Sequence, residues 1–444
     1  MKLLANEIIL EILLHFSVPD EFAELTTLSQ LCRSSKRLQR LAQPILYRYI
    51  PDLNPEKRQL LFRTLLERPD LAQMVQFWDL QDCGIPRPEL LSLVEAVRSK
   101  LRLSESMERK LVSDMQEEKE DLEVSLVLLL LPNLQVMEIS CYYGPDNLKV
   151  GLVKEVKADQ NRPCGHVHHL MHLQEVRIRH GDTELCTRLE PAGLLALPSV
   201  HSLRGWAVCW QDGEEKAEDE YPGVTLNLRH IDLSWSLCDS RALSRMLSRC
   251  PDLQSLQIDW GDATVGADDL DFCAFGTALR KYGRKLEKLD LDCRMAFCYE
   301  EGEATGRIGS LRKLVNLKDL ALPQDILVGR VDDDNDNSDD DTESTASHSR
   351  ILRLEEVLPT ALEEVHFYSC QDDEKHLDDQ ILDIITSSKT KNLRRVTMEA
   401  RESNFHHDVS GFGWSTWRRK NKVFVATKRE FQRVPEKPSR SSFC

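Results

Sequence analysis

The sequence predicts an α/β protein. A small three-helix module at residues 1–50 is followed, at residues 51–400, by a solenoid with parallel strands on its concave face and helices outside. Two observations predict this fold: leucine and isoleucine residues cluster at helical spacing near the N-terminus, and one apolar pattern recurs from residue 71 onward. The length of 444 residues suffices for an extended repeat domain with a small module attached.

The N-terminal module is predicted to contain three short helices. Leu4, Ile8 and Ile12 recur at helical spacing, and two further stretches, 21–31 and 34–41, place leucines on one face. Three such short helices cannot bury all of these apolar side chains against one another. Part of the apolar surface is therefore expected to serve a binding partner.

Two segments of this module resemble the F-box family. Residues 4–13 read LANEIILEIL, which is similar to the F-box opening Leu-Pro-x-Glu-Ile-Ile with a following Ile-Leu. Residues 28–50 read LSQLCRSSKRLQRLAQPILYRYI and resemble the second half of an F-box, most closely that of fungal proteins. The likeness covers residues 1–50, with Ala5 where the family usually has proline. The alternative is an ordinary N-terminal helical hairpin of the larger domain.

The F-box resemblance implies a substrate-recognition subunit of a cullin-RING (SCF-type) ubiquitin ligase. Such a subunit docks to the adaptor through the F-box, and through the adaptor to the cullin. Catalysis then lies on other subunits, so the chain itself is not expected to be an enzyme. The adaptor-binding positions that the resemblance implies are Leu4, Ala5, Ile8, Ile9, Ile12, Leu28, Leu31, Cys32 and Leu38. Any one of them could instead belong to the internal core of the three helices.

From residue 71 onward an apolar residue is followed by another three positions later and by a third two positions after that. The last two positions alternate with polar residues, as in a short half-buried strand. Helical stretches precede many of these frames, and a Pro, Gly or Asn usually intervenes. The frames, of which the fourth is degenerate, are Val75-Trp78-Leu80, Leu134-Met137-Ile139, Leu173-Val176-Ile178, Val200-Leu203-Gly205, Leu228-Ile231-Leu233, Leu253-Leu256-Ile258, Leu286-Leu289-Leu291, Leu317-Leu320-Leu322, Leu362-Val365-Phe367 and Leu393-Val396-Met398.

The spacing of these frames resembles that of leucine-rich repeats, which recur about every 20–29 residues. From Leu134 on, successive frames lie between 25 residues (Leu228 to Leu253) and 45 residues (Leu317 to Leu362) apart, so the longer intervals imply inserted loops. A helix, a turn and a strand repeated with short linkers give a parallel sheet stacked as a curved solenoid. An F-box joined to leucine-rich repeats is itself a known family architecture.

Three segments are predicted to depart from the regular repeats. Residues 102–121 are highly charged and are expected to form an inserted helix or hairpin. Residues 331–349 are acidic and serine-rich, and are expected to be disordered because they cannot bury enough apolar surface. Residues 401–444 are expected to form a basic C-terminal tail, in which residues 418–422 could serve nuclear import or bind an acidic partner. Whether the loop or the tail is regulatory stays open.

The polar residues that alternate with the strand apolars are the candidate substrate-binding surface. The middle strands are acidic, the earlier ones are basic, and tryptophans follow some of the acidic strands. This pattern favours a protein substrate with a basic segment, held by carboxylates with aromatic side chains nearby. The alternative is that these residues only keep a strand face soluble. The predicted substrate-binding residues are Arg177, Arg179, Trp206, Asp232, Trp235, Asp259, Trp260, Asp290, Asp292, His366 and Tyr368.

Composition excludes several other partners. The formal net charge of −16 argues against binding nucleic acid or an anionic membrane. The 13 cysteines are scattered and form no CxxC pair, which indicates reduced thiols in the cytoplasm or nucleus. The longest apolar run, 126–131, is far shorter than the span of about 20 residues that a membrane helix needs.

Little in the sequence points to metal, cofactor or catalytic chemistry. The densest group of metal-ligating residue types is Cys164, His166, His168, His169 and His172, but no second pair completes a zinc site there. No glycine-rich phosphate loop or nucleophile elbow is present. We therefore expect no cofactor and no metal. The second functional hypothesis is a leucine-rich-repeat scaffold for protein interactions that acts outside ubiquitination.

Overall fold

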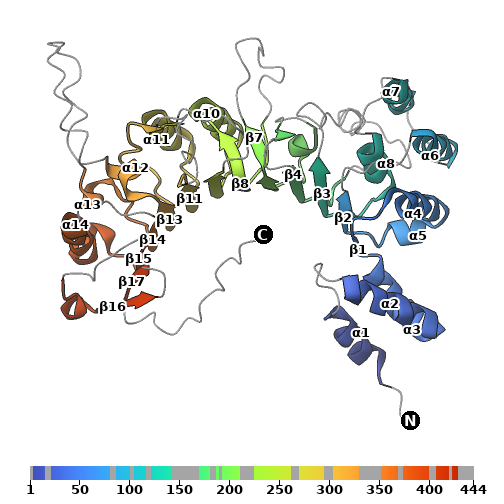
Figure 1. Ribbon diagram of the computed structural model, residues 1–444, viewed down its shortest axis with the longest axis horizontal. Helices are drawn as coiled ribbons and strands as arrows, with labels where there is room; N and C mark the ends of the chain where they lie inside the picture. Colours follow the sequence, from blue (N-terminus) through green and yellow to red (C-terminus); the bar gives the residue numbers. More distant parts are fainter. Residues whose placement is uncertain are drawn as a thin grey trace. The chain divides into compact units, whose positions relative to one another are not determined.

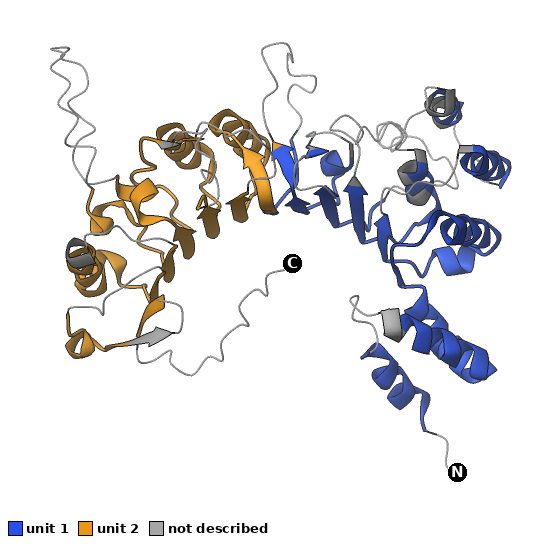
Figure 2. Ribbon diagram, in the orientation of Figure 1, with its two compact units in different colours: residues 1–209, 215–231 blue, residues 210–214, 232–444 orange. Residues whose placement is uncertain are grey.

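The computed structural model describes residues 4–15, 22–80, 87–100, 105–116, 122–141, 170–180, 187–189, 193–210, 225–261, 270–294, 304–329, 352–368, 374–399, 407–419 and 423–428. The chain is a mixed α/β protein with a mostly parallel sheet, which confirms the predicted class at this level (Figure 1). It divides into two compact units, residues 1–209 with 215–231 and residues 210–214 with 232–444 (Figure 2).

Unit 1 begins with three helices where the sequence predicts them. They are α1 (Asn6–Leu14), α2 (Phe22–Ser34) and α3 (Lys36–Leu46). Ser35 caps α3, because its hydroxyl oxygen accepts a hydrogen bond of 3.1 Å from the backbone N–H of Leu38. The helices enclose a small apolar core made of Leu13, Leu28, Ala42 and Ile45.

The rest of unit 1 combines parallel strands with further helices. The helices are α4 (Pro55–Glu67), α5 (Pro69–Ala72), α6 (Arg87–Lys100), α7 (Glu105–Gln116) and α8 (Leu122–Leu130), with a short 3-10 turn η1 (Gly193–Ala196). The strands β1 (Tyr49–Ile50), β2 (Phe77–Leu80), β3 (Val136–Cys141), β4 (Glu175–His180) and β6 (Ser202–Trp206) pair in this order, and β5 (Thr187–Arg188) pairs with β7 (Val208–Trp210).

Unit 2 has the same alternation of strands and helices. Its strands are most of β8 (His230–Cys238), then β9 (Ser255–Trp260), β11 (Lys288–Asp292), β13 (Asp319–Leu322), β14 (Glu364–Phe367) and β15 (Arg395–Met398), with a separate pair β10 (Leu270–Asp271) and β12 (Ala304–Thr305). Its helices are α10 (Ser240–Arg249), α11 (Phe272–Tyr282), α12 (Gln324–Val328), α13 (Leu354–Val357) and α14 (Glu374–Thr386), with 3-10 turns η3 (Ser388–Thr390) and η4 (Ser410–Phe412). Figure 1 shows α10, α11 and α14 on one side of these strands.

The apolar frames of the sequence coincide with the paired strands. In unit 2 the register aligns Leu256 with Leu289, Leu320, Val365 and Val396, and all five are buried. In unit 1 the register aligns the corresponding residues, which are Trp78, Met137, Val176 and Leu203. The polar residues between them therefore lie together on the other face of the sheet in each unit.

The sheet of unit 2 continues beyond residue 400, where the sequence predicts only a tail. Strand β17 (Val423–Lys428) pairs antiparallel with β15, and β16 (Trp414–Arg419) pairs antiparallel with β17. Trp414 and Val425 are buried, so this hairpin belongs to the folded unit. The predicted limit of the strand region at residue 400 is therefore too early, because β16 and β17 pair as an antiparallel hairpin and do not carry the repeated apolar frame.

The predicted insertions are partly described. Helix α7 lies within the charged segment 102–121, and Arg98 of α6 forms an ion pair of 2.6 Å with its Glu108. The acidic segment 331–349 lies outside the described residues. In the described part of the chain, no helix combines the length and the apolar character that crossing a membrane requires.

Candidate functional site

Helix α1 carries an exposed apolar surface. The exposed fractions of Leu4, Ile8 and Ile12 are 57%, 51% and 47%, whereas Leu13 is only 2% exposed and faces the core. Residues four positions apart lie on one face of a helix, so these three side chains form one stripe that runs along α1 and its N-terminal approach. A stripe of large apolar side chains in water is typical of a protein-binding surface.

A second exposed stripe on α1 is absent from the predicted set. Leu10 and Leu14 are 36% and 46% exposed. Successive residues of a helix are rotated by about 100°. Ile9 and Leu13 face inward, so Ile8 lies on one side of them around the helix, and Leu10 and Leu14 lie on the other side. The signal in the sequence was the composition NEIILEILL, which is apolar on more sides than two neighbouring helices can cover.

The start of α1 is held by a side chain from α3. Arg37 donates a hydrogen bond of 2.9 Å to the Asn6 side-chain oxygen and one of 2.5 Å to the Leu4 carbonyl oxygen. Ala5, at the N-cap, has φ −64° and ψ 153°. The backbone at Ala5 therefore already has the φ of about −65° that a proline ring would impose.

The other predicted adaptor-binding positions lie deeper. Leu28 is 1% exposed and belongs to the core of the three helices. Ile9, Leu31 and Cys32 are half-buried and pack against that core, and burial raises the pKa of the Cys32 thiol. Leu38 is also half-buried. The accessible part of the predicted set is therefore Leu4, Ala5, Ile8 and Ile12.

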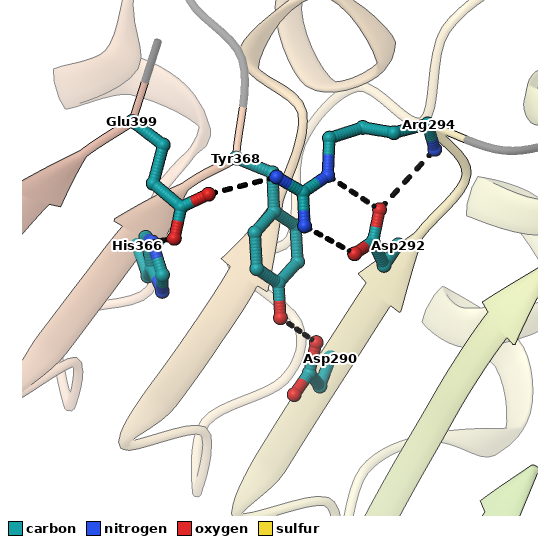
Figure 3. A network of polar contacts seen from close by, with 6 residues as sticks. All are labelled: Asp290, Asp292, Arg294, His366, Tyr368 and Glu399. Carbon is teal, nitrogen blue, oxygen red and sulfur yellow. Dashed lines mark hydrogen bonds and ion pairs between the residues drawn. The ribbon is translucent and has the colours of Figure 1, made fainter. Parts of the chain in front are cut away.

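A network of polar side chains lies on the exposed face of the unit 2 sheet, at the carboxyl ends of its strands (Figure 3). Register places Asp290 of β11 and His366 of β14 in one row, on either side of Ala321. Asp292 ends β11, and Tyr368 and Glu399 directly follow β14 and β15. The sequence predicts Asp290, Asp292, His366 and Tyr368 as site residues, and the structure brings these four together.

Tyr368 is fixed by Asp290. The Tyr368 hydroxyl donates a hydrogen bond to a carboxylate oxygen of Asp290, across the strand that carries Ala321. Burial and the Asp290 carboxylate both raise the pKa of Tyr368, so its hydroxyl stays protonated and remains a donor.

Arg294 joins the network from just beyond β11. Its guanidinium donates to both carboxylate oxygens of Asp292, at 2.9 and 2.6 Å, and to Glu399 at 2.7 Å. It also lies over the Tyr368 ring, 4.6 Å from the ring centroid. The hydrogen bond to Asp292 is the main cause that raises the pKa of Arg294, which remains a cation.

Glu399 and His366 complete the network. The Nε2 atom of His366 lies 3.0 Å from a carboxylate oxygen of Glu399, and the His366 and Tyr368 ring centroids are 4.7 Å apart. Burial favours the neutral form of Glu399, but the hydrogen bonds and charges of His366 and Arg294 outweigh it and lower its pKa. Glu399 is therefore ionised and shared between two basic side chains.

Arg294 and Glu399 are absent from the predicted site. Glu399 had a signal in the sequence, because it occupies the same frame position as Asp292 and Tyr368. Arg294 had none, since it lies beyond the frame. The arrangement of carboxylates around an aromatic ring suits the binding of a cation. Within the described residues, no group of three or more His, Cys, Asp or Glu side chains is placed to hold a metal ion.

The two predicted tryptophan anchors of unit 2 differ in exposure. Trp260 is 1% exposed, and its indole N–H donates a hydrogen bond of 3.1 Å to the Cys238 carbonyl oxygen. It is a core residue, and its prediction as a substrate contact is wrong. Trp235 is 40% exposed and has a left-handed backbone with φ +52°. The predicted Asp232 and Asp259 are half-buried on the polar face.

Gly261 is required beside Trp235. A Cβ atom on Gly261 would lie 2.4 Å from the Trp235 Cα atom. Gly261→Ala is therefore expected to lower the free energy of unfolding by about 1–3 kcal/mol, through overpacking against backbone. Gly411→Ala is the matched control, because nothing lies within 4 Å of a Cβ there. Equal urea midpoints for the two variants would contradict this packing.

The predicted basic residues of unit 1 are paired with acids. Arg177 and Arg179 both form ion pairs with Glu138, and Arg177 also pairs with Glu175 at 2.7 Å. The predicted Trp206 is half-buried at the end of β6. The positive charge that the sequence places on β4 is therefore largely balanced by glutamate side chains on the same face of the sheet.

The histidine cluster of the sequence lies mostly outside the described residues. Residues 164–169 are not among them, and His172 is described after Leu170, in a turn before β4. In comparisons with known proteins, no family model and no curated protein matches this chain.

Proposed function

We propose that the chain is a substrate-recognition subunit of a cullin-RING (SCF-type) ubiquitin ligase, that its N-terminal helices are an F-box, and that it is not itself an enzyme. The observation that carries the proposal is the exposure of Leu4, Ile8 and Ile12 on α1. These residues coincide with the positions that the F-box resemblance assigns to adaptor contact. Exposure of an apolar stripe to water is unfavourable, so its burial against the adaptor would stabilise the complex.

The proposal extends to a leucine-rich-repeat solenoid that holds the substrate. One inter-frame hydrogen bond recurs and supports it. In each case an asparagine directly precedes the first residue of a frame. Its side-chain amide N–H donates to the backbone carbonyl oxygen of the residue that lies two positions before the first residue of the preceding frame. The four instances are Asn133 to Gln73 at 2.7 Å, Asn227 to Pro198 at 3.0 Å, Asn316 to Arg284 at 2.9 Å and Asn392 to Thr360 at 3.0 Å. Equivalent bonds between successive units are expected of stacked repeats.

The polar face of unit 2 is the proposed substrate surface. Asp290, Asp292 and Glu399 lie there around the Tyr368 ring, and the substrate is a protein with a basic segment. The chain then acts in the cytoplasm or nucleus, where the cullin ligases work.

Proximity labelling in cells tests whether the N-terminal helices bind the adaptor while the rest of the chain binds the substrate. The full chain is expected to label the adaptor, the cullin and substrate proteins. Changing Leu4 and Ile8 together to aspartate is expected to remove the adaptor and cullin signals and to leave the others. Loss of every signal, or retention of the adaptor signal, would count against the proposal.

Ala5→Pro tests whether the missing proline matters. Because Ala5 already has φ −64°, we expect the ring to fit without strain. The free energy of unfolding should rise by about 0.5 kcal/mol, since proline restricts the unfolded chain. Adaptor affinity should stay equal or increase. Chemical denaturation measures the free energy of unfolding, and titration with the adaptor measures the affinity. Weaker binding of the adaptor to Ala5→Pro would show that the start of α1 does not contact the adaptor as proposed.

A further inference from the structure

We propose that Asp292, Tyr368 and Glu399 form a seat for an arginine side chain, that Arg294 occupies this seat within the chain, and that an arginine of a bound protein segment displaces it. The inference rests on the proposed function, because it names the side chain that the substrate surface recognises. It also makes Arg294 a built-in competitor of the substrate.

The seat makes every kind of contact that a guanidinium group favours. Asp292 accepts two hydrogen bonds at 2.9 and 2.6 Å, and Glu399 accepts a third at 2.7 Å. The Tyr368 ring supplies an aromatic face at 4.6 Å (Figure 3). A planar, forked cation uses a paired carboxylate and an aromatic face together, and the ammonium group of lysine cannot match that geometry.

The seat is largely held in place without Arg294. Tyr368 is held by its hydrogen bond to Asp290. The backbone N–H of Glu399 donates a hydrogen bond of 2.9 Å to the Phe367 carbonyl oxygen, and the Nε2 atom of His366 lies 3.0 Å from the Glu399 carboxylate. Asp292 ends strand β11, and it also accepts a hydrogen bond of 3.2 Å from the backbone N–H of Arg294. The side chain of Arg294 can therefore leave while the seat keeps its shape.

Arg294 has the exposure expected of an exchangeable occupant. Its side chain is 42% exposed, whereas Asp292 is 18% and Glu399 is 28% exposed. The bond to Glu399 joins residues 105 positions apart. Asp292 is the last residue of β11, Glu399 directly follows β15, and Arg294 lies two residues beyond β11. When Arg294 leaves, two carboxylates remain beside an aromatic ring, and they attract a basic protein segment.

Peptide binding to the full chain tests the proposal. Fluorescein-labelled Gly-Gly-Arg-Gly-Gly is titrated with the wild type and with Arg294→Ala, and binding is followed by fluorescence anisotropy. Analogues with lysine or citrulline in place of the arginine are the matched peptides, and citrulline keeps the shape without the charge. A tethered competitor acts at an effective concentration in the millimolar range, so its removal should tighten binding of the arginine peptide at least about ten-fold.

Two further variants locate the effect. Arg294→Lys keeps a cation but lacks the fork, and should give an affinity between those of the wild type and Arg294→Ala. Adding Glu399→Gln to Arg294→Ala should reverse most of the gain. The proposal is overturned if Arg294→Ala binds the arginine and citrulline peptides equally, or no tighter than the wild type does. Unchanged binding after Glu399→Gln would also overturn it. Thermal unfolding shows that each variant is folded.

The same preparations are tested for adaptor binding, which involves α1 in unit 1. Retained adaptor binding with a failed peptide result refutes the arginine seat alone. The absence of adaptor binding with arginine-specific peptide binding refutes the proposed function alone.

Discussion

Changing Leu4 and Ile8 together to aspartate is expected to weaken adaptor binding at least about 100-fold. Both side chains are more than half exposed in the free chain, at 57% and 51%, so their replacement should leave its folding intact. In the proposed complex with the adaptor, both positions are expected to become buried. Losing one apolar anchor costs about 2 kcal/mol or more, and burying an unpaired carboxylate costs more. Isothermal titration of the purified chain with purified adaptor measures the change.

Leu60→Asp is the matched control for this experiment. Leu60 lies on α4, outside the N-terminal module, and is 61% exposed. The substitution therefore makes the same chemical change at an equally exposed leucine. It should leave adaptor affinity unchanged. If Leu60→Asp and the double aspartate variant bind adaptor equally well, the docking surface on α1 is refuted.

Arg58→Ala is expected to lower the free energy of unfolding by about 3–5 kcal/mol. Arg58 is 1% exposed on α4 and pairs with Glu123 of α8 at 3.0 Å and with Asp52 at 3.3 Å. It also donates to the Leu53 carbonyl oxygen at 2.8 Å. Removing the guanidinium takes away the cation that lies 3.0 Å from the Glu123 carboxylate, and Glu123 is itself only 5% exposed. Urea denaturation followed by circular dichroism measures the loss.

Arg68→Ala provides the comparison for Arg58. Arg68 pairs with Asp70 at 2.6 Å, but both side chains are more than half exposed, so water replaces the lost contact. We expect little change in its denaturation midpoint. The double change Arg58→Ala with Glu123→Ala should recover part of the loss, because the buried carboxylate is then removed together with its cation. Equal midpoints for Arg58→Ala and Arg68→Ala would contradict this account.

The strands could be predicted from the sequence because their signal is local. Leu256, Leu289 and Leu320 each occupy the same frame position, and alternation alone places them on the buried face. The polar residues between them then share the other face. Asp290, Asp292, His366 and Tyr368 could therefore be chosen as neighbours without knowing any distance.

The two tryptophans show where local reasoning fails. Trp235 and Trp260 occupy the same frame position, and regular alternation would bury both. Trp260 follows the alternation and is buried. Trp235 is turned outward at a residue with φ +52°, against the backbone of Gly261. A backbone torsion of this kind depends on packing with the next strand, so the apolar pattern could not reveal it.

Contacts between segments that lie far apart in the sequence could not be predicted either. Arg294 meets Glu399 because β11 and β15 belong to one sheet, with β13 and β14 between them. That pairing depends on the order and register of the strands. The burial of Arg58 with Glu123 is similar, since α4 and α8 lie far apart in the sequence. The sequence identified the acidic strands and the apolar helix, but not how their charges are compensated.

Assembly of the full chain with purified adaptor and cullin tests the central claim most directly. Mass photometry of the mixture should show one complex with a single copy of each protein, and the Leu4→Asp/Ile8→Asp variant should remain alone. A complex of the chain with the adaptor that excludes the cullin would support the scaffold hypothesis. The absence of any complex with the wild-type chain would contradict the assignment of the N-terminal helices as an F-box.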